Sequence, residues 1–107
     1  MANPMTTMSS YASFADFYPD YLRAHQNCTC RRLHFFGTTL VILMLAGILA
    51  TGAWIWLVAV PVAGYGPAWI GHFYFERNRP ATFSHPLYSL IGDFRMYADM
   101  CTGKIRF

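Results

Sequence analysis

The sequence predicts an all-α membrane protein, a helical hairpin of two transmembrane or re-entrant helices flanked by two amphipathic interfacial helices. Only 12% of the 107 residues are charged and 55% are hydrophobic, whereas about 25% of the residues in an ordinary soluble domain are charged. Residues 35–71 contain no Asp, Glu, Lys or Arg. Apolar residues recur at helical spacing on both sides of this run. The length predicts one domain over residues 1–107.

The uncharged run is too long for one membrane crossing, which needs about 20 residues, and is close to two short ones. Thr51-Gly52 supplies a turn, so we expect membrane helices over residues 28–51 and 53–75. Prolines and glycines in the second arm predict an irregular helix, because proline removes a helical hydrogen bond. A shallow hairpin that dips into one leaflet is the alternative to a full crossing.

The flanking segments predict amphipathic helices over residues 11–26 and 85–102, with residues 1–10 as a flexible N-terminus. Helices of this kind lie on a membrane interface. All eight Lys and Arg residues lie outside residues 35–71, and none lies at the turn. The positive-inside rule therefore places both ends of the chain in the cytoplasm.

Charge and cysteine content exclude several other classes. The net charge is only +3, and the basic residues are scattered, so no nucleic-acid partner is predicted. Cys28, Cys30 and Cys101 match no zinc spacing, and an odd number argues against a disulfide framework. We expect free thiols in a reducing compartment.

The candidate metal ligands are the four histidines of the chain, His25, His34, His72 and His85. His34 precedes Ala53 by the same 19 residues by which His72 follows it. A hairpin that turns at this point brings both imidazoles to the same depth. An N-cap at Asn27 lets His25 fold back toward His34, and the position of His85 permits the same convergence.

Imidazole clusters without cysteine or carboxylate partners suit iron, zinc or copper. Glu76 follows His72 by one helical turn and shares its face. It is a candidate acceptor for the His72 ring or a further ligand, and an ion pair with Arg77 or Arg79 is the alternative. Histidines at a membrane boundary also occur as plain interfacial residues, so the residues alone leave both interpretations open.

Three stretches carry a resemblance to a known family: "FADFYPDYLRAHQNCTCRRLHFFGT" (14–38), "GYGPAWIGHFYFERNRPATFSHPLYSLIGDFRMY" (64–97) and "TGK" (102–104). They resemble the small bacterial members of the Mpo-like family. The shared motifs are H-x8-H, G-H-F with an acidic residue four positions beyond the His, and N-[RK]-P-A. The resemblance covers nearly the whole chain.

This resemblance implies an enzyme, an Fe(2+)-dependent non-haem dioxygenase that uses O2 to shorten 2-hydroxy fatty acids by one carbon in α-oxidation. It implies activity at the cytoplasmic face of a bacterial inner membrane, on a fatty acid or other lipid. The family's histidines fall on His25, His34 and His72, and His85 fits the bacterial pattern F-x-H-P. Arg79 or Arg32 would steady the substrate carboxylate.

Two other functions fit the residues. One is a non-enzymatic membrane scaffold or lipid-binding protein with interfacial histidines, and the other is a zinc-dependent membrane hydrolase. Metal content distinguishes the scaffold from an iron enzyme. O2 consumption distinguishes the zinc-dependent hydrolase from an iron dioxygenase.

Overall fold

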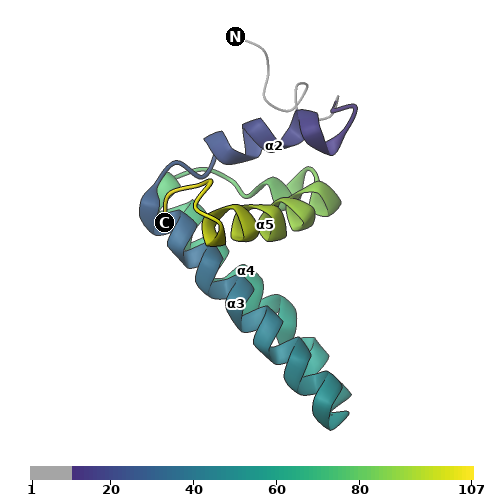
Figure 1. Cartoon of the computed structure of the whole chain (residues 1–107). Coiled ribbons are helices and arrows are strands. Elements are labelled where there is room, and N and C mark those ends of the chain that lie inside the picture. Colours follow the sequence, from purple (N-terminus) through teal and green to yellow (C-terminus); the bar gives the residue numbers. More distant parts are fainter. Residues whose placement is uncertain (1–10) are drawn as a thin grey trace.

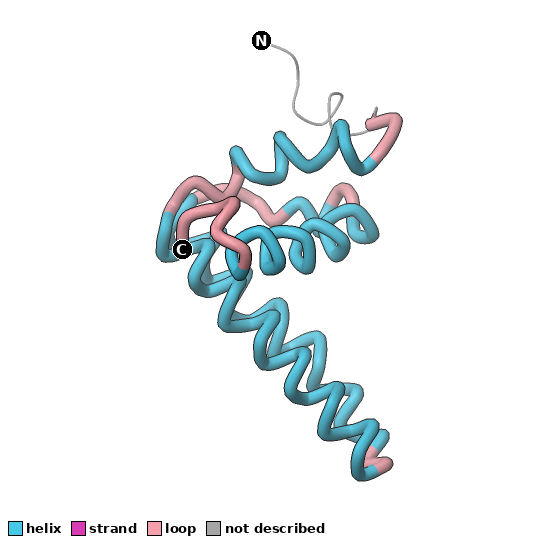
Figure 2. Tube along the Cα trace, viewed as in Figure 1, coloured by secondary structure: helices cyan, strands magenta, loops and turns pink. Residues whose placement is uncertain are grey.

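The computed structural model describes residues 11–107, and every regular element in this range is helical (Figures 1 and 2). In chain order the elements are α2 (Phe14–Arg23), α3 (Cys28–Thr51), η1 (Trp54–Ala59), α4 (Val60–Ile70), η2 (Gly71–Glu76), η3 (Ala81–Phe83) and α5 (Pro86–Cys101). The predicted all-α class with two long apolar helices is confirmed. The expectation of a flexible segment over residues 1–10 falls outside the described residues.

A long antiparallel hairpin is formed by α3 and by the run from η1 through η2 (Figure 1). Both arms, Cys28–Thr51 and Trp54–Glu76, are long and apolar enough to cross a membrane. Few of their side chains are buried within the protein, and large apolar ones such as Leu43, Leu49 and Ile55 are exposed. An exposed apolar surface of this extent is typical of a site of membrane contact.

A tight turn joins the two arms, which then pack closely. The turn begins at Gly52, whose φ of 71° lies in the left-handed region that favours glycine. Farther along, Gly37 lies against α4, where an added Cβ would be 2.8 Å from the carbonyl oxygen of Gly64. The missing side chain lets the two backbones approach. This close packing holds together the ends of the arms that carry His34 and His72.

The second arm changes helix type twice, since η1 is a 3₁₀-helix, α4 an α-helix and η2 a π-helix. Short π-helices are rare and occur frequently at functional sites, and this one carries His72. It ends at Arg77, whose φ of 59° is left-handed. The amides of Arg77 and Asn78 both donate to the carbonyl oxygen of His72. The chain therefore turns back toward His72 directly after the π-helix.

Helices α2 and α5 lie across one end of the hairpin, and α2 packs on α5 (Figure 2). Their shared core contains Phe17, Tyr21, Met96 and Met100. Other apolar residues of α5, including Leu87 and Ile91, stay exposed. A helix that buries one face in the protein and exposes a second apolar face is suited to the membrane interface.

Two tyrosine–aspartate hydrogen bonds join the same pair of helices. Tyr18 donates to Oδ2 of Asp99 at 2.7 Å, and Tyr21 donates to Oδ1 of Asp93. Gly92 makes room for the Tyr21 ring, because an added Cβ at this position would lie 3.0 Å from it. These contacts fix α2, and with it the loop that follows, relative to α5.

Candidate metal centre

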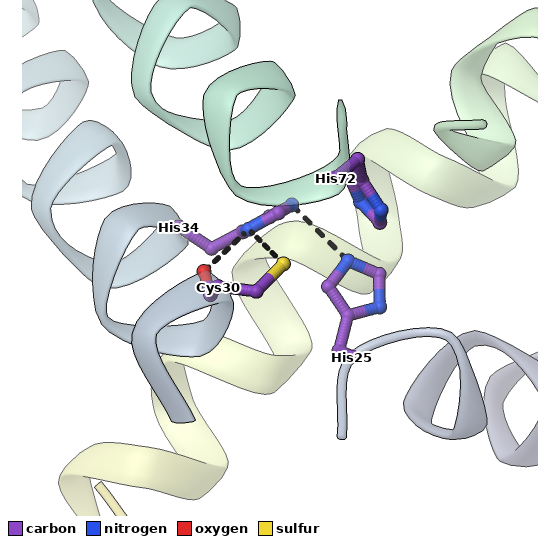
Figure 3. Close-up of side chains that lie close together, drawn as sticks. All are labelled: His25, Cys30, His34 and His72. Atoms are coloured by element: carbon purple, nitrogen blue, oxygen red, sulfur yellow. Dashed lines mark hydrogen bonds between the residues drawn. The ribbon is translucent and has the colours of Figure 1, made fainter. Parts of the chain in front are cut away.

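Four buried side chains converge where α2 and α5 cross the end of the hairpin (Figure 3). They are His25, Cys30, His34 and His72, whose candidate ligand atoms all lie within 4.8 Å of one another. We call these four residues the histidine cluster. They come from three segments of the chain: the loop after α2, the first turns of α3, and the π-helix η2.

The start of α3 explains how His25 reaches the cluster. Asn27 caps this helix, and its Oδ1 accepts the amide of Cys30 at 3.2 Å. The break between α2 and α3 folds His25 back, so that its Nε2 lies 3.1 Å from Nε2 of His34. The ring centroids of His34 and His72 are 4.9 Å apart, in agreement with their equal distances from the turn.

Each of the three histidine rings directs Nδ1 at a carbonyl oxygen. The pairs are His25 with the backbone of Tyr21 at 2.6 Å, His34 with the backbone of Cys30 at 2.9 Å, and His72 with Oδ1 of Asn78 at 2.7 Å. A carbonyl oxygen can only accept, so Nδ1 carries the proton in all three rings. The lone pairs are therefore on the three Nε2 atoms, which is the form in which imidazole binds a metal.

The facing nitrogens of His25 and His34 fit a shared cation. They cannot bond to each other directly, since neither Nε2 carries a proton. Two nitrogen ligands of one metal ion, each about 2.0–2.1 Å from it, lie roughly 3 Å apart. Because neutral imidazoles suit iron, zinc or copper, the donor set fits a transition metal of this kind.

Burial keeps the His25 imidazole neutral. Loss of solvent is the main cause that holds the pKa of His25 well below its ordinary value, and charge repulsion from His34 and His72 acts in the same direction. The hydrogen bond to the backbone of Tyr21 opposes this effect on the pKa. A neutral ring at physiological pH leaves Nε2 available for a metal in place of a proton.

Asn78 supports the cluster from outside. Its side-chain oxygen accepts from His72, and its Nδ2 donates to the backbone carbonyl of Ala24 at 3.1 Å. The second bond fixes the orientation of the amide, so the oxygen is the atom that faces His72. Asn78 thus ties the π-helix η2 to the loop that carries His25. Asn78 was not among the site residues predicted from the sequence.

Glu76 was predicted to accept a hydrogen bond from the His72 ring or to bind the metal, and the structure gives it another contact. Its Oε2 accepts the backbone amide of Asn27 at 2.6 Å, and the acceptor for His72 is Asn78. The ion pairs found among residues 11–107 do not include Glu76 with Arg77 or Arg79. Its contact joins the end of η2 to the beginning of α3.

Cys30 is the cluster member that was not predicted from the sequence, and the structure places it beside the three histidines. Its Sγ is buried, 3.7 Å from Nδ1 of His34. It packs against Gly71, where an added Cβ would lie 2.9 Å from Sγ. The available signal was its position four residues before His34, which puts both on one helix face. The predicted free thiols at all three cysteines are confirmed.

His85 lies apart from the histidine cluster. It is the N-cap residue of α5, and its ring packs against aromatic side chains, 5.2 Å between centroids from Tyr11 and 5.7 Å from Phe17. The structure therefore brings together three of the four predicted histidines and places the fourth in an aromatic environment.

An apolar cavity of about 250 Å³ lies beside the cluster, between α3, α4 and α5. His34 and Asp93 contribute polar groups to its wall, and Val41, Val60 and Leu90 are among its apolar lining residues. Ligand sites are typically clefts of this kind, mostly apolar with a few polar groups. An apolar ligand in this cavity would reach the His34 ring directly.

The two arginines predicted to hold a substrate carboxylate do not line this cavity. Nε of Arg32 donates to the carbonyl oxygen of Phe107 at 3.2 Å. The Arg79 guanidinium lies over the Phe83 ring, 5.1 Å from its centroid. Both side chains are held by contacts outside the histidine cluster.

Comparison with known proteins identifies a family. No curated protein and no solved structure matches the chain. The family model described as "2-hydroxy-palmitic acid dioxygenase Mpo1-like" matches residues 11–105. This range includes all four members of the histidine cluster and the residues that line the cavity. The chain therefore belongs to the Mpo1-like family, as its sequence resemblance indicated.

Proposed function

We propose that this protein is an iron(II)-dependent dioxygenase that shortens 2-hydroxy fatty acids by one carbon. The observation that carries the proposal is the convergence of three buried imidazole rings, whose candidate ligand atoms lie within 4.8 Å of one another, beside an apolar cavity. The family description supports the same reaction class and substrate type. Iron(II) would supply the activation of O2, as in other non-haem iron oxygenases.

In this proposal His25, His34 and His72 hold the iron through Nε2. The carbonyl oxygens bonded to their Nδ1 atoms fix the ring orientations and make the rings better ligands. Three protein ligands leave positions on the metal for other groups, as catalytic sites require. The burial of all three rings keeps bulk water away from the centre.

The overall reaction balances without a further reductant. One 2-hydroxy acid and one O2 give a fatty acid shorter by one carbon, one CO2 and one H2O. The carbon that bears the hydroxyl group loses three electrons and the carboxyl carbon loses one. These four electrons equal the number that O2 accepts.

The substrate would reach the site from the membrane. We place the hairpin in a bacterial inner membrane, with the histidine cluster and both chain ends at the cytoplasmic face, because basic residues lie at that end and none lies at the turn. The alkyl chain would occupy the cavity along Val41 and Val60, with its carboxyl group toward His34.

A zinc centre is the second candidate, and the observation that favours it is the presence of Cys30 in the cluster. A closed set of nitrogen and sulfur ligands is typical of structural zinc, whereas a hydrolytic zinc site keeps one open position. Either arrangement would use the same histidines without consuming O2.

The deciding experiment measures metal and turnover on the same sample. Protein purified anaerobically in detergent should hold about one iron per chain and, when O2 is admitted, convert 2-hydroxypalmitate to the acid one carbon shorter. His34→Ala and His72→Ala should lose both the iron and the activity. His85→Ala is the matched control and should keep the iron, because this ring lies outside the cluster.

The other outcomes identify which part of the proposal fails. Wild-type protein without metal would support a lipid-binding scaffold, and zinc without O2 consumption would support a hydrolase. Iron that is lost in His34→Ala, together with no shortening of 2-hydroxypalmitate, would keep the metal site and reject the substrate.

A further inference from the structure

We infer that Asp93, held in place by Tyr21, binds the 2-hydroxyl group of the fatty acid and so selects hydroxylated over plain acyl chains. This inference rests on the proposed function, because it takes a 2-hydroxy acid as the substrate. It assigns a role in substrate recognition to a residue of α5 that lies outside the histidine cluster.

Asp93 supplies the only carboxyl group in the lining of the cavity beside His34. Its Oδ1 accepts from Tyr21. Asp93 is half-buried, and its Oδ2 is not one of the fully buried polar atoms that lack a partner, so this oxygen is accessible to a ligand. In a mostly apolar wall, an accessible carboxyl oxygen is the group to which a polar ligand atom can hydrogen-bond. A ligand hydroxyl in the cavity would form such a bond.

Tyr21 connects this carboxyl group to the metal centre. Its ring stacks on the His25 ring with 4.0 Å between centroids, its backbone oxygen accepts from Nδ1 of His25, and its hydroxyl donates to Asp93. The side chain is almost fully buried, and Gly92 leaves little space beside it. One rigid residue therefore fixes Asp93 relative to His25.

The second tyrosine–aspartate pair shows how a structural link between α2 and α5 is built. Asp99 accepts from Tyr18 and is also paired with Arg95, whose Nε lies 3.2 Å from Oδ2. This pair does not line the cavity. Asp93 has no such ion pair among the described residues. A link between the helices does not by itself require that the carboxyl group line a cavity.

Charge favours the hydroxyl group of the substrate over its carboxylate as the partner of Asp93. Two carboxylates side by side would repel each other. A hydroxyl group can donate to an ionised carboxylate and accept from a protonated one. Burial raises the pKa of Asp93 to about 7, so both forms occur near neutral pH. The substrate carboxylate would then lie toward the histidine end of the cavity.

Binding measured without turnover tests this inference. Iron-loaded protein in detergent under nitrogen is titrated with 2-hydroxypalmitate and with palmitate, each displacing a fluorescent fatty acid. The ratio of the Kd for palmitate to the Kd for 2-hydroxypalmitate measures selectivity for the hydroxyl group. Wild type should favour 2-hydroxypalmitate. Asp93→Ala should lower the ratio about tenfold, as expected for the loss of a hydrogen bond to a charged group, with the Kd for palmitate nearly unchanged.

Two tyrosine variants separate selectivity from structure. Tyr21→Phe keeps the ring on His25 and removes the hydroxyl group, so the iron content should remain while the ratio falls severalfold. This variant also carries the test if Asp93→Ala does not fold. Tyr18→Phe removes the matching hydroxyl group from the other pair and should leave the ratio unchanged.

The inference is overturned if the ratio is unchanged in the folded Asp93 variant or in Tyr21→Phe. It is also overturned if wild type binds both acids equally, or if Tyr18→Phe lowers the ratio as much as Tyr21→Phe does. Failure of the proposed function appears differently, as missing iron or missing product in the wild type, whatever the binding ratio.

Discussion

Nε2 of His25 lies 3.1 Å from Nε2 of His34, and both atoms present lone pairs because each ring donates its Nδ1 proton to a backbone carbonyl. A cation between these two nitrogens would interact favourably with both lone pairs. Packing of α2 on α5 and the cap at Asn27 position the two rings. Metal binding is therefore expected to stabilise the folded chain, since the ion binds the native arrangement and not the unfolded one.

Removal of the Asn78 amide should weaken metal binding. Asn78→Ala takes away the acceptor for Nδ1 of His72 and the bond to Ala24, and the loss of such a partner lowers metal affinity roughly 10–100-fold. Anaerobic iron(II) titration measures this change. Glu76→Gln is the control, because the amide oxygen can still accept the amide of Asn27. A greater loss in the control than in Asn78→Ala would contradict the assigned roles.

Substitution of Cys30 distinguishes a three-histidine iron centre from a zinc centre that includes sulfur. Cys30→Ser nearly preserves the size of a side chain that packs against Gly71. If the histidines alone hold the metal, the variant should keep its iron and its activity on 2-hydroxypalmitate. Elemental analysis and the turnover assay measure both. Loss of the metal in this variant would make Cys30 a ligand and favour zinc.

The stability difference between wild type and Asp93→Asn should depend on pH. Burial raises the pKa of Asp93 from 3.8 to about 7, although its bond from Tyr21 acts to lower the pKa. Between these values the folded chain retains a proton that the unfolded chain releases, so the free energy of unfolding of wild type falls as pH rises from about 4 to 7. The variant lacks this contribution. Its free energy of unfolding, relative to that of wild type, should therefore rise by at most about 4 kcal/mol over that pH range.

Thermal midpoints of both proteins in detergent at pH 5 and pH 8 measure this effect. His25 has the opposite effect, because its pKa is lowered by burial and its protonation at lower pH destabilises the folded chain. This effect is present in both proteins and cancels in the difference between them. A difference between the proteins that is the same at both pH values would contradict a raised pKa at Asp93.

Alanine at Gly37 should separate the two arms of the hairpin. The added Cβ would lie 2.8 Å from the carbonyl oxygen of Gly64, and overpacking of this kind costs roughly 1–3 kcal/mol. Gly47→Ala on the same helix is the control. Its Cβ meets no atom within 4 Å, and alanine is the better helix former by about 1 kcal/mol.

The thermal midpoint should therefore fall in Gly37→Ala and stay or rise in Gly47→Ala. Iron affinity should fall only in the first variant, because a wider spacing of α3 and α4 moves His72 away from His34. Equal behaviour of the two variants would show that the close approach at Gly37 does not position the metal centre.

The hairpin and the convergence of three histidines could be predicted because they depend on composition and spacing. An uncharged run with a central turn predicts the two helical arms of a hairpin, and this prediction does not depend on how their side chains pack. Equal distances from Ala53 then bring His34 and His72 to one level. The cap residue Asn27 marks the break that returns His25 to the same place.

The partners of His72 could not be predicted, because they depend on helix type. In an α-helix Glu76 would share the face of His72. The π-helix η2 winds with more residues per turn, and Glu76 bonds to Asn27 instead. The left-handed residue Arg77 then reverses the chain and brings Asn78 to Nδ1 of His72. No apolar periodicity in the sequence marks a π-helix.

Cys30 and His85 show two other limits of reading spacing alone. Cys30 matched no cysteine pattern, and its relation to His34 appears only when mixed nitrogen and sulfur sets are considered along one helix face. The position of His85 depends on the path of the chain from Arg77 to α5 and on packing with Tyr11 and Phe17. Neither depends on a local repeat.

If the proposed substrate enters the cavity between α3, α4 and α5 from a bilayer, its effective concentration is its amount per lipid molecule and not its amount per volume of solution. The rate of the proposed enzyme would then follow the mole fraction of substrate in the bilayer. Added empty vesicles would dilute the substrate in two dimensions and slow turnover, although the amount of substrate in the sample stays the same. The bilayer then acts as the solvent of the reaction, and long chains that partition fully into it are the substrates it presents best.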